Sequence, residues 1–179
     1  MTIKYTIKWK KTSFNDVIDV RSPVEFQEDH IPGSINLPVL YNEQRVNIGT
    51  IYKKESPFKA KKIGASLVSN NISKHLKKVL ISKPGNWKPL IYCWRGGQRS
   101  KAFATVLSEI GWQVTILKGG YKTYRSSINN EINKLTKTSR FIVLKGPTGC
   151  AKTKILEILK KQGLSVLNLE ELASHKGSL

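Results

Sequence analysis

Cysteines are scarce in this sequence of 179 residues, which contains only Cys93 and Cys150, far apart in the chain. Two such thiols exclude the multi-disulfide framework of small secreted proteins, and they cannot complete a zinc site by themselves. We therefore expect a reducing, cytoplasmic environment and no metal site. In that environment a single well-placed cysteine can serve as a nucleophile.

Long hydrophobic runs are also absent. No stretch approaches the roughly 18–20 apolar residues that cross a bilayer. The N-terminal sequence MTIKYTIKWKK has neither the apolar core nor the small-residue cleavage site of a signal peptide. We expect no membrane association and no export. Hydrophobic residues still make up 39% of the chain, which suffices for a packed core and argues against general disorder.

Acidic residues are few. Lysine and arginine total 31 against 12 aspartates and glutamates, so the net charge is +19. A surface of this kind attracts phosphate-rich polymers through counterion release, which predicts nucleic-acid binding. A lysine-rich face that merely keeps the protein soluble is the alternative. Most of the excess lies in residues 41–140, chiefly at Lys53, Lys54, Lys59, Lys61, Lys62, Lys74, Lys77, Lys78, Lys83 and Lys88.

Hydrophobic periodicity predicts strands that alternate with helices, which is typical of an α/β fold with a mainly parallel sheet and helices on both faces. Ser22 is expected to cap a helix that begins at Pro23. A polar stretch, residues 129–140, should end a helix and form a linker, so we predict domains at 1–136 and 137–179. The expected strands are 3–9, 17–20, 35–37, 90–92, 114–117, 141–144 and 166–169. Besides the helix that begins at Pro23, the expected helices are 56–81, 100–110 and 152–161.

The most informative segment joins the expected strand 90–92 to the helix that follows it. Its backbone N–H groups are expected to form an anion-binding nest, for which Gly96 and Gly97 permit the tight conformation. The helix N-terminus, with Arg95 and Arg99, should favour the thiolate of Cys93. An inert buried cysteine is the alternative. The predicted catalytic residue is Cys93, in a loop formed by Trp94, Arg95, Gly96, Gly97, Gln98, Arg99 and Ser100.

The length of this loop suggests its ligand. The ring from Cys93 through Arg99 is wide enough for a tetrahedral oxyanion, so phosphate, or phosphate carrying sulfur or selenium, is a candidate. The same Cys-x5-Arg-Ser spacing occurs in cysteine-dependent phosphatases. Group transfer and phosphate hydrolysis therefore both stay open.

A second glycine loop follows the expected strand 141–144. The sequence GPTGCAKT, residues 146–153, fits the phosphate-loop pattern except at Ala151, which replaces the last glycine and whose methyl group is expected to crowd a phosphate. A chance glycine loop before a helix is the alternative, and nucleotide binding is left open. The candidate phosphate-binding residues are Gly146, Gly149, Lys152 and Thr153.

Two groups of motifs carry a family resemblance. The segment from Asp19 to Pro38, with DVRSP and HIPGSINLP, resembles the front half of a rhodanese domain. The loop CWRGGQRS resembles the active loop of one branch of that family, the tRNA 2-selenouridine synthases. The resemblance covers nearly the whole chain but only about the first half of a usual member. The last apolar elements are therefore expected to lack a full core and to be either poorly ordered or shielded by a partner. Further matching segments are 45–53, 64–68, 110–112 and 119–125.

The resemblance implies an enzyme that replaces the sulfur of wobble 2-thiouridine (U34) with selenium from selenophosphate, through an S-geranyl intermediate made from geranyl diphosphate. Cys93 matches the cysteine expected to carry a perselenide, and Asp19 and Arg21 would support its loop. The implied partners are selenophosphate and the anticodon region of tRNA, with no tightly bound cofactor. His30 is expected to be a turn residue, and Trp94 either stacks on a ligand or packs.

Other functions stay compatible with the same residues. A rhodanese-type sulfurtransferase would use thiosulfate or a persulfide as its donor. A cysteine phosphatase would use the same loop for hydrolysis. A non-catalytic tRNA-binding remnant would keep only the basic surface.

Overall fold

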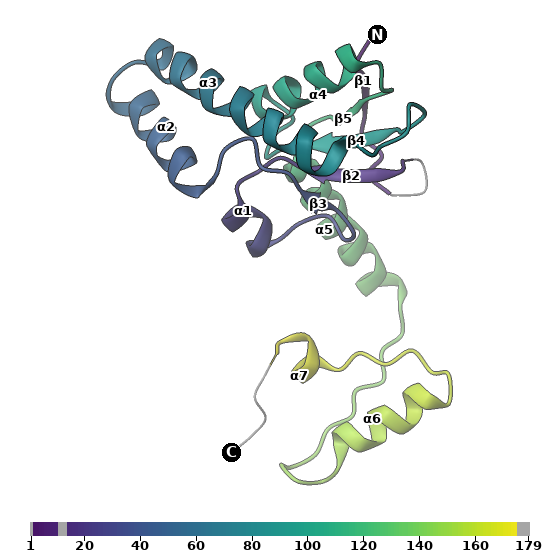
Figure 1. Cartoon of the computed structure of the whole chain (residues 1–179). Coiled ribbons are helices and arrows are strands. Elements are labelled where there is room, and N and C mark those ends of the chain that lie inside the picture. The colour runs from purple at the N-terminus through teal and green to yellow at the C-terminus, as the bar shows by residue number, and fades with distance from the viewer. Residues whose placement is uncertain (1, 11–13, 175–179) are drawn as a thin grey trace. The chain divides into compact units, whose positions relative to one another are not determined.

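The computed structural model describes residues 2–10 and 14–174. These residues form two compact units, one that ends at Lys134 and one that begins at Leu135. The first unit is built on a five-stranded sheet in the order β1-β5-β4-β2-β3, with every neighbouring pair parallel (Figure 1). The predicted parallel sheet is confirmed. The strands are β1 (Lys4–Thr6), β2 (Asp16–Asp19), β3 (Ile35–Asn36), β4 (Pro89–Tyr92) and β5 (Thr115–Leu117).

Helices cover both faces of the sheet, as predicted. On one face, Ile91 packs in a core with Ile72 and Phe103. On the other face, Leu90 and Tyr92 pack in a separate core that includes Tyr121. The helices of the first unit are α1 (Pro23–Glu28), α2 (Asn42–Lys54), α3 (Pro57–His75), the π-helical turn η2 (Leu76–Leu80), α4 (Gln98–Ile110) and most of α5 (Gly120–Thr138).

The topology places the candidate site at one edge of the sheet. Strand β4 lies between β2 and β5, with Ile91 opposite both Ile18 and Ile116. Because parallel strands end on the same side, the segments that follow β2, β4 and β5 meet at the carboxyl edge. Those segments begin with Val20, Cys93 and Lys118. Parts of the chain that are distant in sequence are thereby brought together.

Helix α2 is an element that the sequence analysis did not predict. It packs beside α3 as a helical hairpin (Figure 1), in which the buried Asn71 donates to Gln44 Oε1 at 2.8 Å and to the Val39 carbonyl at 3.1 Å. Of its 13 residues only Ile51 is buried, so α2 lacks a clear apolar face. The expected helix at 56–81 is confirmed as α3 followed by η2.

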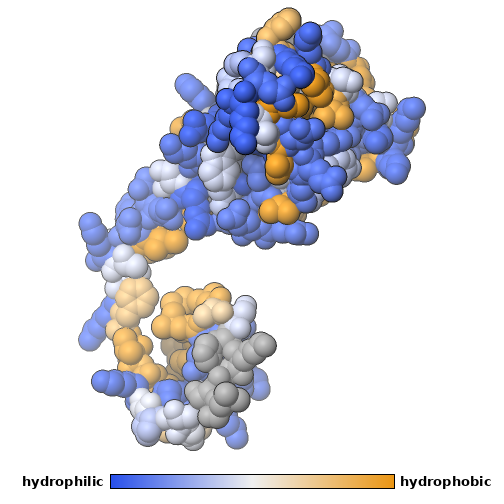
Figure 2. Space-filling model, turned by 90° about the vertical axis from the view of Figure 1, so that its left-hand side faces the viewer, coloured by the Kyte–Doolittle hydropathy of each residue, from blue (hydrophilic) through white to orange (hydrophobic). Residues whose placement is uncertain are grey.

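The second unit contains helices α6 (Lys152–Lys161) and α7 (Leu169–Leu172). Helix 152–161 was predicted with these bounds. The strands expected at 141–144 and 166–169 are wrong, because neither segment pairs with a neighbour and Leu169 begins α7. Ile142 is 95% exposed and Val143 is 82% exposed. The apolar run at 141–144, a pattern that usually marks a buried strand, is therefore not part of a sheet. Figure 2 shows exposed apolar side chains gathered on this unit.

Among the described helices of both units, none has the length and apolar character that crossing a membrane requires.

Candidate active site at the cysteine loop

Cys93 lies directly after β4 and is only 3% exposed. Its Sγ is 3.3 Å from the Oγ of Ser100, a buried residue in the first turn of α4. The Ser100 hydroxyl also lies 3.1 Å from the Gly97 carbonyl oxygen, which closes the loop on itself. The predicted strand–loop–helix arrangement is therefore present, with the sulfur near the N-terminus of a helix.

The backbone of the loop is held by its carbonyl groups. The N–H of Tyr121 donates to the Cys93 carbonyl at 2.8 Å, and the N–H of Lys122 donates to the Trp94 carbonyl at 3.1 Å. Within the described part of the chain, the backbone N–H groups of residues 94–98 donate no hydrogen bond to another residue. A series of free N–H groups ahead of a helix N-terminus suits an anion.

Two glycines fix the path of this loop. Gly96 has φ +65°, and a Cβ at this position would lie 2.7 Å from the Leu117 carbonyl oxygen. Gly120, the first residue of α5, has φ +60°, and its Cβ would lie 2.1 Å from the Cys93 carbonyl oxygen. Side chains are excluded at both positions, and the close approach of α5 to the cysteine loop depends on this.

Gly96→Ala is expected to destabilise the protein by about 2 kcal/mol or more, because left-handed backbone costs an alanine roughly 1–2 kcal/mol and the methyl group also meets backbone. Gly97→Ala is the matched control, since Gly97 has φ −94° and open space around its Cβ position. It should change stability by less than about 0.5 kcal/mol. Urea unfolding of both variants measures the difference, and equal effects would contradict the assigned loop geometry.

Arg99 has a partner that the sequence analysis missed. Its guanidinium forms two hydrogen bonds with Glu25, at 2.7 Å and 3.2 Å. The same carboxylate accepts from the Ser22 backbone N–H at 3.0 Å, which caps α1. Burial tends to raise the pKa of Glu25, but the bonds and charge of Arg99, together with Ser22, lower it below its ordinary value of 4.5. The pair joins α1 to the cysteine loop, whereas Arg95 and Gln98 are exposed.

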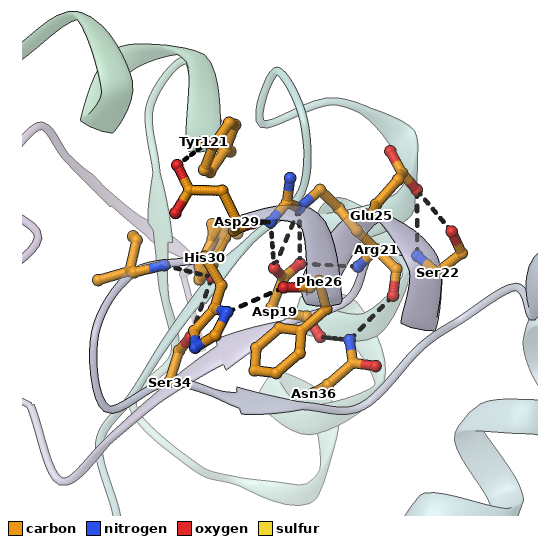
Figure 3. Close-up of polar contacts among 12 residues, drawn as sticks. Asp19, Arg21, Ser22, Glu25, Phe26, Asp29, His30, Ser34, Asn36 and Tyr121 are labelled. Carbon is orange, nitrogen blue, oxygen red and sulfur yellow. Dashed lines mark hydrogen bonds and ion pairs between the residues drawn. The ribbon is translucent and has the colours of Figure 1, made fainter. Parts of the chain in front are cut away.

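Asp19 and Arg21 form a buried ion pair beneath the loop, with 0% and 1% side-chain exposure (Figure 3). Arg21 Nη2 lies 2.7 Å from Asp19 Oδ2 and donates to the Asp29 carbonyl at 2.6 Å. The guanidinium also lies 4.1 Å from the centre of the Tyr121 ring. The pair is therefore shielded from solvent and contacts both the turn at Asp29 and the Tyr121 ring. This arrangement suits the supporting role expected of Asp19 and Arg21.

Tyr121 links this network to the loop. Its ring stacks on Trp94 at 5.3 Å, while Trp94 itself is 41% exposed. Its hydroxyl donates to the Asp29 carboxylate, which also pairs with Arg125. Burial and the bond to Asp29 raise the pKa of Tyr121 to about 12, so it stays protonated at neutral pH. No role was predicted from the sequence for Asp29, Tyr121 or Arg125.

His30 lies in the turn after α1, as expected. Its Nδ1 is 2.8 Å from the Phe26 carbonyl oxygen, and its ring stacks on Phe26 at 3.9 Å. Both contacts hold the turn in place.

The second glycine loop lies in the other unit. Lys152 Nζ, at the start of α6, donates to the carbonyls of Gly146 and Pro147 at 2.9 Å and 2.7 Å. Ala151 adopts left-handed backbone with φ +58°, the conformation for which a glycine is suited. Gly149, with φ +83°, lies within the loop, and Thr153 follows Lys152 in the first turn of α6. No cluster of three or more metal-ligating side chains occurs in the portion of the chain that the structure describes.

A model of the rhodanese-like domain matches residues 3–127, which include the sheet, the cysteine loop and the network beneath it. The chain belongs to the rhodanese family. A second model, described as the tRNA 2-selenouridine synthase AAA domain, matches residues 139–179. The rhodanese-type α/β fold expected for the first unit is thereby confirmed.

Curated relatives carry the name tRNA 2-selenouridine synthase. The protein from Bdellovibrio bacteriovorus is 37% identical over 170 residues, which cover 90% of this chain and 42% of the relative. The protein from Sulfurovum sp. is 39% identical over 166 residues, which cover 90% of this chain and 44% of the relative. The resemblance inferred from the motifs is confirmed. The chain spans less than half the length of these relatives.

A solved structure agrees with this assignment. The N-terminal domain of a Clostridium difficile 630 protein is 37% identical, with a TM-score of 0.56, and the match covers 63% of this chain and 87% of that domain.

Proposed function

We propose that this rhodanese-family chain is a selenotransferase acting on tRNA, with Cys93 as the covalent carrier of selenium. The main support is the nearly buried Cys93 sulfur beside free backbone N–H groups and a helix N-terminus. The +19 net charge suits an RNA substrate, and the names of the relatives indicate the modified nucleoside.

The first step loads selenium onto the enzyme. The Cys93 thiolate attacks the selenium of selenophosphate, forming an S–Se bond and breaking the Se–P bond. The phosphorus keeps the electron pair of the broken bond, takes a proton from solvent and leaves as phosphite. The oxyanions of the donor match the N–H groups of residues 94–98, and the Ser100 Oγ lies 3.3 Å from the sulfur.

The second step transfers selenium to the nucleoside. The 2-thiouridine sulfur displaces diphosphate from geranyl diphosphate, and the terminal selenium of the Cys93 perselenide attacks C2 of the S-geranyl base. Geranylthiolate leaves with the C–S electron pair. A second thiol, a reductant of the glutathione class, attacks the Cys93 sulfur and forms a disulfide. The S–Se electron pair stays on selenium and gives 2-selenouridine.

The second unit is proposed to supply an anion site for this chemistry, at Gly146, Gly149, Lys152 and Thr153. A diphosphate entering the loop would replace the Gly146 and Pro147 carbonyl oxygens as the partner of the Lys152 ammonium. Such a ligand has a charge opposite to that of the lysine, which favours the exchange.

Incubation of the full chain with selenophosphate, without tRNA, tests the loading step. The Cys93 peptide should gain the mass of one selenium atom, and phosphorus NMR should show phosphite in equal amount. Release of phosphate with no adduct on Cys93 would contradict the perselenide and would indicate direct delivery of selenium to the base.

A rhodanese-type sulfurtransferase is the second candidate, because the family model spans residues 3–127. In that reaction Cys93 attacks the outer sulfur of thiosulfate, an S–S bond forms, and sulfite leaves with the electron pair. Competition between thiosulfate and selenophosphate for Cys93 distinguishes the two. A persulfide that forms at least about tenfold faster than the perselenide would favour the sulfurtransferase.

A further inference from the structure

An open groove of about 580 Å³ runs between α1 and α2. On one side it is lined by Ser22, Val24 and Glu25. On the other side it is lined by one face of α2, at the three- and four-residue spacing of a helix from Asn42 to Lys54. A bond from the Val24 N–H to Asn42 Oδ1, at 3.1 Å, joins the two walls.

The charge of the groove is positive. Arg45, Lys53 and Lys54 line it, and none of the three forms an ion pair with another residue in the described ranges. Its carboxylate, Glu25, is already bonded to Arg99. Three free cations along one helix face suit a ligand that carries several negative charges in a row.

Exposed apolar and aromatic side chains lie on the same helical hairpin as these cations. Val46, on the groove wall, is 69% exposed. Tyr52 is 53% exposed and Phe58 is 69% exposed, at the tip of the α2–α3 hairpin, where Lys62 lies 5.1 Å from the Phe58 ring centre. An exposed aromatic ring beside a lysine, as at Phe58 and Lys62, provides a stacking surface for unpaired bases in addition to phosphate contacts.

Gly49 gives the groove its depth. It lies in the middle of the lining face of α2, where any other residue would place a side chain in the groove. Glycine inside a helix is less favourable for helix formation than alanine. A Cβ at Gly49 would be 3.1 Å from Arg45 Nη1, the end of a flexible side chain, so the backbone can accept a larger residue.

The groove also adjoins the candidate active site. Glu25 lines it and at the same time holds Arg99 of the cysteine loop. An extended ligand that lies along α2 toward Glu25 therefore approaches the loop that carries Cys93.

We propose that this groove binds a single-stranded segment of the tRNA, with backbone phosphates at Arg45, Lys53 and Lys54. The inference rests on the proposed function for its RNA substrate. To that function the inference adds the surface that binds the RNA and the direction from which the RNA approaches Cys93.

Two variants of the full chain test this groove, with unmodified tRNA and an anticodon stem-loop RNA as probes. K53E/K54E reverses two groove charges and should weaken binding at least about tenfold at 0.1 M salt. It should also reduce the slope of log K against log salt by roughly one to two units. Gly49→Leu fills the groove without changing the charge and should weaken binding at least about fivefold. Thermal unfolding verifies the fold of each variant.

The matched control is K77E/K78E, which makes the same charge change at two exposed lysines of η2. It should weaken binding less than about threefold. If K53E/K54E and K77E/K78E lose tRNA affinity equally, and Gly49→Leu binds as tightly as the wild type, the groove is not the binding site. That result would indicate diffuse electrostatic attraction. Tighter binding of duplex RNA than of the stem-loop would also overturn the proposal. A wild-type chain that binds no tRNA at all would instead refute the RNA part of the proposed function.

Discussion

Replacement of Cys93 by serine is expected to abolish selenium loading and transfer, with a rate loss of at least about a thousandfold. Serine keeps the shape of the side chain and the contact with Ser100, so the loop should persist. The hydroxyl is far less ionised and less nucleophilic than a thiol, and it forms no stable bond to selenium. Mass spectrometry of the loaded protein and nucleoside analysis of the tRNA measure the loss.

Cys150→Ser is the matched control, because Cys150 is the other free cysteine and is exposed in the second unit. This variant should load selenium at the wild-type rate. The Cys93→Ser protein should still bind tRNA with unchanged affinity, since the sulfur takes no part in the phosphate contacts. Formation of 2-selenouridine by the Cys93→Ser protein would refute the carrier role.

Asp19→Ala is expected to destabilise the protein by about 3–5 kcal/mol, because it leaves the charge of Arg21 buried without its partner. The substitution also removes the bond from the Arg21 backbone N–H, at 2.9 Å, which shapes the chain after β2. Since Arg21 packs on Tyr121, and Tyr121 stacks on Trp94, loosening should spread to the cysteine loop. Urea unfolding gives the stability, and the rate of Cys93 alkylation reports on the loop.

Glu55→Ala provides the comparison, because the Lys59–Glu55 pair has an equally short contact of 2.6 Å but lies about half exposed. Loss of such a surface pair should cost less than about 1 kcal/mol and leave Cys93 alkylation unchanged. A loss for Asp19→Ala as small as that for Glu55→Ala would show that burial adds nothing to the pair and would contradict its supporting role.

The sequence predicted the part of the fold that depends on local patterns. Strand β4 is buried on both sides and reads as a short apolar run, and α4 begins after a Gly-Gly turn. The strands assigned at 141–144 and 166–169 were wrong, because a strand depends on a neighbour that hydrophobic pattern alone does not reveal. Helix α2 was missed for a related reason, since most of its residues are exposed and its pattern shows no apolar face.

The candidate site was predictable only where its residues are contiguous. Cys93 and its loop form one segment, and Asp19 and Arg21 are two positions apart. The partners of that segment come from elsewhere in the chain: Glu25 is 74 positions from Arg99, and Asp29 is 92 positions from Tyr121. Spacing gives no signal for such pairs. The signal that existed for Glu25 was its position three residues after Ser22, which marks a helix cap.

The position of Trp94 has a practical consequence for spectroscopy. Trp87 and Trp112 are enclosed in the core and Trp9 is half-buried, whereas Trp94, the residue next to Cys93, is 41% exposed. Its indole emission is therefore open to solvent quenchers that do not reach the two enclosed rings. Heavy atoms such as selenium quench indole fluorescence at short range. The protein thus carries its own optical reporter of chalcogen loading, readable without an added dye.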